Sequence, residues 1–123
     1  MISVDYESAV QKESAVCPGV TYRVARMSFG RRIELMRLVK EVTMKFDFHE
    51  AAGAVGNMAV AILSSEVDRL YIRWALKAVD GLVIDGLSAT PETLLLDGPE
   101  GLLKEALAII RSECGLGDEE KKT

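Results

Sequence analysis

Apolar residues recur at helical spacing in two long segments of the chain. In residues 28–46 they fall three or four positions apart, which predicts an amphipathic helix of about five turns with one buried face. Ser28 precedes this segment, where its hydroxyl can accept a hydrogen bond from the first free N–H groups of the helix. The side chains expected to face the core are Phe29, Ile33, Met36, Val39, Val42 and Phe46.

A second helix is predicted from Met58 to Val79, after a break that Gly53 and Gly56 favour. Its apolar stripe is wide, so we expect this helix to be central, with neighbours on two sides. The main stripe consists of Ile62, Leu63, Val67, Leu70, Trp74 and Ala78.

Two short segments have the pattern of β-strands. Residues 20–26 nearly alternate apolar and polar side chains and are rich in β-branched and aromatic types. The segment 82–88 begins with an apolar run and contains Asp85-Gly86, a dipeptide typical of hairpin turns. We expect the run to pair both with the end of its own segment and with the 20–26 strand, in one small antiparallel sheet.

Two further helices are indicated by the residues at their starts. Thr90-Pro91-Glu92 supplies a capping hydroxyl, a proline at the first helical position and an acid in the first turn. A short helix over 93–96 should follow. Gly98-Pro99 repeats this arrangement and opens a last helix over 99–114.

The predicted fold class is therefore mainly α (α+β), with three to four helices packed together and a small antiparallel β element from residues 20–26 and 82–88. A length of 123 residues fits one domain. We expect a single helical domain over 20–116, with a weakly ordered lead-in over 1–19 and a charged flexible tail over 117–123.

Composition and charge indicate a globular protein and argue against a nucleic-acid-binding or membrane-spanning one. Hydrophobic residues make up 49% of the chain and charged residues 28%, which fits a globular fold. The net charge is −4, yet residues 21–45 carry +5 and residues 81–123 carry −5. A pI near 5.0 argues against a nucleic-acid-binding domain. The chain has no apolar run of membrane-spanning length and its first residues do not resemble a signal peptide, so we expect a cytoplasmic protein.

The sequence offers no set of residues for catalysis, for a metal or for a cofactor. His49 is the only histidine, and Gly53 stands where a zinc-protease motif needs a second one. Cys17 and Cys114 are isolated thiols, which suits a reducing compartment. No glycine-rich phosphate-binding motif occurs. We therefore predict no enzyme activity, no catalytic residues, no metal site and no cofactor.

Three stretches carry a resemblance to a known family. They are Tyr22-Arg23-Val24-Ala25-Arg26-Met27-Ser28-Phe29-Gly30-Arg31-Arg32, then Leu70 to Gly86 with its Asp80-Gly81 and Asp85-Gly86 turns, then Thr90-Pro91-Glu92 through Gly98-Pro99-Glu100 to Cys114-Gly115-Leu116. In this order the chain resembles, over about residues 20–123, the tail-assembly chaperones of long-tailed phages and prophages.

The resemblance implies a non-catalytic, protein-binding role in virion morphogenesis, inside the bacterial host cell. Such a chaperone coats the long, helix-rich tape-measure protein until tail-tube subunits assemble around it. The implied partners are the tape-measure and tail-tube proteins, and self-association stays open. The resemblance implies neither a membrane nor a nucleic acid as a partner.

The candidate partner-binding residues are Leu94, Leu95, Leu96, Arg31 and Arg32. Three consecutive leucines on a short helix cannot all face one core, so at least one should reach the surface; core packing of two of them is the competing interpretation. The alternative function is a small regulatory or adaptor domain that binds nucleic acid through the basic 23–45 segment. It would use Arg23, Arg26, Arg31 and Arg32.

Overall fold

The computed structural model describes residues 3–51 and 56–114, and within these ranges all side chains except those of 46–51 and 56–57. Helices predominate and the strands are antiparallel, so the expected fold class is confirmed. The elements are β1 (Ala9–Glu13), β2 (Thr21–Ala25), α1 (Phe29–Ala51), α2 (Gly56–Ala75), β3 (Leu76–Asp80), β4 (Val83–Ile84), β5 (Leu87–Ser88), α3 (Pro91–Asp97) and α4 (Glu100–Cys114).

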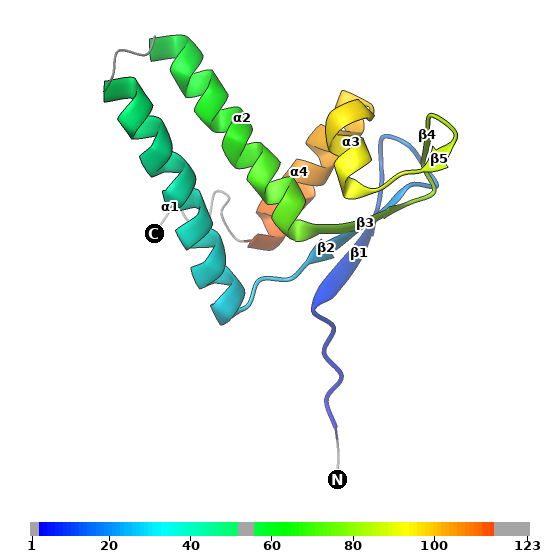
Figure 1. The fold of residues 1–123 in the computed structure, drawn as a ribbon. Coiled ribbons are helices and arrows are strands. Elements are labelled where there is room, and N and C mark those ends of the chain that lie inside the picture. Colours follow the sequence, from blue (N-terminus) through cyan, green and yellow to red (C-terminus); the bar gives the residue numbers. More distant parts are fainter. Residues whose placement is uncertain (1–2, 52–55, 115–123) are drawn as a thin grey trace.

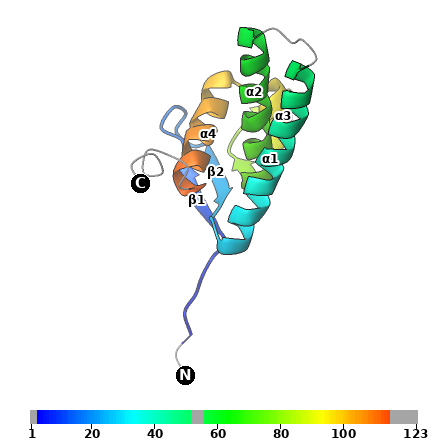
Figure 2. The same ribbon diagram turned by 90° about the vertical axis from the view of Figure 1, so that its left-hand side faces the viewer.

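The main sheet has three antiparallel strands in the order β1-β2-β3. On the central strand Tyr22 and Val24 are fully buried, whereas Arg23 between them is exposed. Alternation of this kind means that one face of the sheet is packed and the other is solvated. Helix α4 lies across the packed face (Figure 2).

The core lies where the sheet, α4, α3 and the sheet-proximal part of α2 meet, and α1 adds Leu35 to it. Burial of each large apolar side chain here contributes roughly 1.5–3 kcal/mol relative to exposure. Its largest fully buried side chains are Tyr22, Leu35, Ile72, Leu94, Ile110, Val20, Val24 and Cys114. In the described part of the chain every buried side-chain nitrogen or oxygen has a hydrogen-bond partner.

Helices α1 and α2 form an antiparallel hairpin that projects away from the sheet (Figure 1). α1 packs mainly against α2, whereas α2 also contacts α3 and α4. The prediction that the second helix is central is thus confirmed. No helix in the described ranges is long and apolar enough to cross a membrane.

The second helix ends earlier than predicted. α2 stops at Ala75, and the residues up to Asp80, which include the predicted end at Val79, form β3 instead. Strand β2 takes this segment as a partner, pairing Tyr22 with Val79 across the sheet. Cross-strand packing on a buried face outweighs the helical spacing of these residues.

The strand predicted at 20–26 is confirmed as β2, but its partners differ from those expected. The 82–88 segment forms only its own hairpin, β4–β5, with Asp85 at φ 52° and Gly86 at φ 81° in the turn. It does not join β2, because β1 and β3 already occupy both edges of that strand.

Strand β1 was not predicted; it lies inside the 1–19 lead-in. Only Ala9 is buried and Val10 half-buried, so the segment lacks the apolar alternation that marks a strand. Its register, from Ala9 opposite Ala25 to Glu13 opposite Thr21, comes from pairing with β2. This strand is therefore specified by its pairing with β2 and not by a local sequence pattern.

The predicted buried face of α1 is wrong in its first half. Phe29, Ile33 and Met36 are 83%, 50% and 62% exposed, whereas Leu35 is 2% exposed. The predicted Val39 and Val42 are half-buried, and the side chain of Phe46 lies outside the described residues. The covered side of the helix therefore consists of Leu35, Leu38, Val39 and Val42.

Paired alanine substitutions test this orientation of α1. Leu35→Ala should lower the free energy of unfolding by about 2–4 kcal/mol, because it empties a packed site. Met36→Ala, one residue on, should change it by less than about 0.5 kcal/mol, because its side chain is exposed. Urea unfolding of both variants measures the difference, and equal losses would contradict the orientation.

Gly81 follows β3 at a point where two loops touch. Its φ is +83°, and a Cβ there would lie 2.1 Å from the carbonyl oxygen of Gly19. Gly86 has nearly the same φ, +81°, but its Cβ would meet nothing within 4 Å. Alanine substitutions at the two positions therefore distinguish the cost of backbone strain alone from the cost of strain with a steric clash.

Gly86→Ala should cost about 1–2 kcal/mol, the strain of a left-handed alanine. Gly81→Ala should cost clearly more, about 3 kcal/mol or above, since the loop that contains Gly19 must also move. Thermal unfolding of the two variants compares them directly. Similar losses would mean that the contact between the loops is not tight.

Candidate protein-binding groove

A groove with a volume of about 300 Å³ lies between α2, α3 and α4. Four leucines supply its apolar surface, and polar or charged side chains supply its rim. From α2 come Ser65, Asp68 and Arg69, from α3 come Leu95 and Leu96, and from α4 come Glu100, Leu103, Lys104 and Leu107.

The short helix α3 is held in place by a cap at its start and by one buried leucine. The Thr90 side-chain oxygen accepts from the Thr93 N–H at 3.1 Å, and the Thr93 hydroxyl oxygen accepts from the Thr90 N–H at 2.8 Å. This reciprocal cap confirms the predicted helix start. Leu94 then anchors the helix in the core with no exposed surface. Successive helical residues are about 100° apart, so Leu96 points outward.

Charged pairs border the groove. Lys104 lies 3.6 Å from Glu100 along α4, and Arg111 of α4 pairs with Asp68 of α2. Exposed pairs of this kind contribute at most about 1 kcal/mol each. Their larger effect is to give the apolar surface a rim that carries both signs of charge.

The three predicted partner-binding leucines differ in how far they are exposed. Leu94 is buried in the core and is not available to a partner. Leu95 is half-buried and Leu96 is 64% exposed, and both line the groove. The interpretation that two of the three pack inward thus holds for Leu94 and partly for Leu95.

Arg31 lies elsewhere, in a more open hollow of about 670 Å³ beside the start of α1. Its guanidinium carbon lies 5.5 Å from the centroid of the Trp74 ring, and Glu34 accepts a hydrogen bond from the indole N–H. Arg32 is half-buried. The structure therefore does not bring Arg31 into the groove of the leucines.

The arginines of the nucleic-acid alternative have different surroundings. Arg23 is exposed on β2, whereas the guanidinium of Arg26 lies 5.7 Å from the ring centroid of Tyr6. Arg31 stacks on Trp74. Two of the four thus contact aromatic rings of the protein itself, which reduces their availability to phosphate groups.

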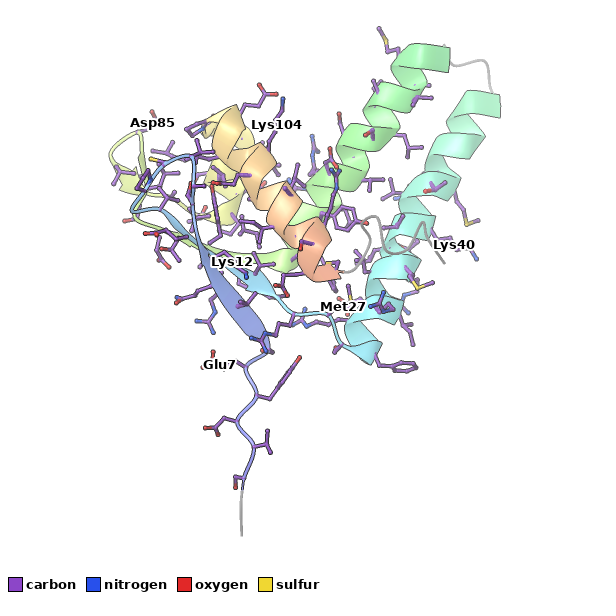
Figure 3. The ribbon with its side chains drawn as sticks, turned by 180° about the vertical axis from the view of Figure 1, so that it is seen from behind. Glu7, Lys12, Met27, Lys40, Asp85 and Lys104 are labelled. Carbon is purple, nitrogen blue, oxygen red and sulfur yellow. The ribbon has the colours of Figure 1, made fainter. Side chains whose placement is uncertain are left out.

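A second apolar surface runs along α1, and we call it the α1 stripe. Its apolar members are at least half exposed and recur at steps of three, four or eight residues, so they share one face of the helix. Lys40 lies within the same face and is exposed (Figure 3). The stripe consists of Phe29, Ile33, Met36 and Met44 around Lys40.

A polar cluster around Glu105 joins α4 to the loop between β1 and β2. The carboxylate accepts hydrogen bonds from the hydroxyl of Tyr22 at 2.8 Å and from the hydroxyl of Ser14. It also accepts from the backbone N–H groups of Ala15 and Val16 at 2.8 and 3.1 Å. Desolvation opposes the charge, but these hydrogen bonds outweigh it and lower the pKa of Glu105.

The same cluster changes the acidity of Tyr22. Burial, and then its hydrogen bond to Glu105, raises the pKa of this phenol to about 12. Tyr22 therefore stays protonated and acts as a donor at neutral pH. The cluster is structural: it satisfies a buried hydroxyl and closes a loop.

The described residues were expected to hold no metal ion, and their His, Cys, Asp and Glu side chains form no cluster of the kind that binds one. Cys114 has no exposed surface and burial raises the pKa of its thiol, while Cys17 is exposed on a loop. The side chain of His49 and the 117–123 tail lie outside the described residues.

Sequence reasoning missed several residues of the groove. Leu107 and Asp68 line the groove, and neither is among the predicted partner-binding residues. Leu103 and Leu107 are four residues apart on α4, which is a usable signal for one shared apolar strip on that helix. The pairing of Asp68 with Arg111 joins distant segments and has no local signal.

Comparison with protein-family models, with curated proteins and with solved structures yields no match to this chain.

Replacement of Glu105 by glutamine tests the polar cluster. Hydrogen bonds to a charged acceptor each contribute about 1.5–3 kcal/mol, so Glu105→Gln should lower the free energy of unfolding by about that amount at neutral pH. Because folding lowers the Glu105 pKa, the extra stability is present above the ordinary value of 4.5 and is lost as pH falls through the folded value.

The difference between wild type and Glu105→Gln should thus shrink from pH ~6 to pH ~3. Glu100→Gln is the control, because Glu100 lies on the same helix with an 80% exposed side chain and forms an exposed pair with Lys104. Urea unfolding across this pH range measures both variants. A difference that does not vary with pH would contradict the role given to the charge of Glu105.

Proposed function

We propose that this protein is a non-catalytic, protein-binding domain that acts as a tail-assembly chaperone, in the cytoplasm of a bacterial host. In this role it binds helical segments of a tape-measure protein before tail-tube subunits enclose them. The observation that carries the proposal is the groove between α2, α3 and α4, with exposed Leu96 at its edge and Leu107 in its wall. The proposal also rests on the family resemblance of residues 20–123.

The composition of the groove supports a helical client. A volume of about 300 Å³ is at the small end for ligand sites but is enough for apolar side chains from one face of a helix. The leucine surface has no directional hydrogen-bonding group, so it would select by shape and hydrophobicity. A rim with both Lys104 and Glu100 would tolerate clients of varied charge.

Tolerance of this kind suits a chaperone that covers many related segments of one long protein. Each apolar side chain that moves from water into the groove contributes free energy in proportion to its buried area, about 25 cal/mol per Å². Each contact is therefore weak and reversible, and many copies can bind along one client and later leave it.

Peptide binding tests the proposal. Synthetic helical peptides that tile the tape-measure protein of the same genome are titrated into the full chain by calorimetry. Leu96→Ser should weaken binding about tenfold, since it removes an anchor at the groove. Leu87→Ser is the matched control, because Leu87 is 73% exposed but lies on the β4–β5 hairpin.

Two results would overturn the proposal: no tape-measure peptide binds, or Leu96→Ser and Leu87→Ser bind equally well. Salt-sensitive binding of duplex DNA that is lost in Arg23→Gln would instead favour the regulatory alternative. Circular dichroism confirms that each variant is folded before it is compared.

A further inference from the structure

Residues 3–8 extend from β1 as an arm beyond the body of the protein (Figure 1). The arm alternates in character: Val4 and Tyr6 are 89% and 65% exposed, and the acids Asp5 and Glu7 lie between and beside them. An extended segment with this alternation has one apolar edge and one acidic edge. The apolar edge of the arm is therefore open to contact with another surface.

The α1 stripe has the complementary character. Its apolar members include Ile33 and Met36, with Lys40 among them and Arg37 beside them, all exposed. The arm contains two acids and no basic residue. Opposite charges on the two surfaces favour contact, and long basic side chains can lie along apolar surface while their charged ends reach a carboxylate.

The arm does not lie on the α1 stripe of its own chain. The carbonyl of Ser8 accepts a hydrogen bond from the Arg26 N–H at 2.8 Å, and the Arg26 guanidinium lies over the ring of Tyr6. These contacts hold the base of the arm, which extends away from the body of the protein at the end where α1 begins (Figures 1 and 2). Glu7 is labelled at this position in Figure 3.

A second copy of the chain can bring the arm beside an α1 stripe. The arm and the start of α1 lie at the same end of the molecule (Figure 1). A two-fold axis at that end would place each arm beside the α1 of the other copy, with the arm and that helix antiparallel in chain direction. The lengths also agree, because six extended residues span about 20 Å and the helix from Phe29 to Met44 rises about 22 Å.

We propose that the protein forms a two-fold dimer in which the arm of each copy, through Val4 and Tyr6, docks on the α1 stripe of the other. Asp5 and Glu7 then lie near Arg37 and Lys40. The interface is separate from the α2–α3–α4 groove, so the dimer can be tested independently of the proposed chaperone function.

Sedimentation equilibrium of the full chain over a range of concentrations tests the dimer. Val4→Ser/Tyr6→Ser in the arm and Ile33→Ser/Met36→Ser in the stripe should each raise the dimer dissociation constant at least about tenfold. Val83→Ser is the control, because Val83 is 64% exposed on the β4–β5 hairpin and outside the interface. It should leave the dissociation constant unchanged.

Mixing the two double variants decides between arm exchange and other dimers. One copy then has an intact arm and the other an intact stripe, so a heterodimer with one complete contact should form at concentrations where neither variant dimerises alone. Charge reversal gives an independent reading: Glu7→Lys and Lys40→Glu should each weaken the dimer, and the two together should partly restore it.

A wild-type chain that stays monomeric would overturn the inference. So would a dimer that survives the arm substitutions, which would indicate direct stripe-to-stripe packing, or a mixture of the two double variants that stays monomeric. Peptide binding at the groove is measured on the same variants. Retained peptide binding in a variant that no longer dimerises would show that the two surfaces act independently.

Discussion

The fold depends on burial of one face of β2. This strand lies between β1 and β3, and its inward side chains, Tyr22 and Val24, have no exposed surface. To bury them, the chain must end α2 at Ala75 and supply β3 as a partner, then return α4 across the same face. Tyr22 adds a polar requirement, since its hydroxyl must be satisfied inside the core, and Glu105 of α4 meets it. The position of α4 is therefore fixed by packing and by hydrogen bonding together.

The two apolar surfaces follow from this arrangement. Because α4 and α3 pack on the sheet and on α2, their leucines divide between the core and the groove: Leu94 is buried and Leu96 is exposed. Because α1 packs mainly on α2, a helix with two apolar rows can cover only one of them. The row that contains Leu35 is covered, and the row that contains Met36 is left on the surface. The exposed row is thus a consequence of how few neighbours α1 has.

The two surfaces suit different partners for physical reasons. The groove is small, has leucine walls and is bordered by charges of both signs, which would suit the apolar side chains of the proposed clients. The α1 stripe is longer and basic, and the arm of the same protein is extended, apolar and acidic, so the two are complementary in charge as well as in apolar character. A protein with this division could associate with itself without covering the surface proposed for its client.

The sequence by itself determined the elements whose signals are local. Caps and turns at Thr90, Asp85 and Gly86, together with helical spacing, predicted α3, α4, the hairpin and most of α1 and α2, because these depend on a few neighbouring residues. Tertiary structure alone decided what depends on distant contacts: β1, the change from helix to strand after Ala75, the face that α1 buries, and the groove that joins Asp68, Leu96 and Leu107. Periodicity states that a face is apolar; only the neighbours that the whole fold places beside it decide whether that face is covered.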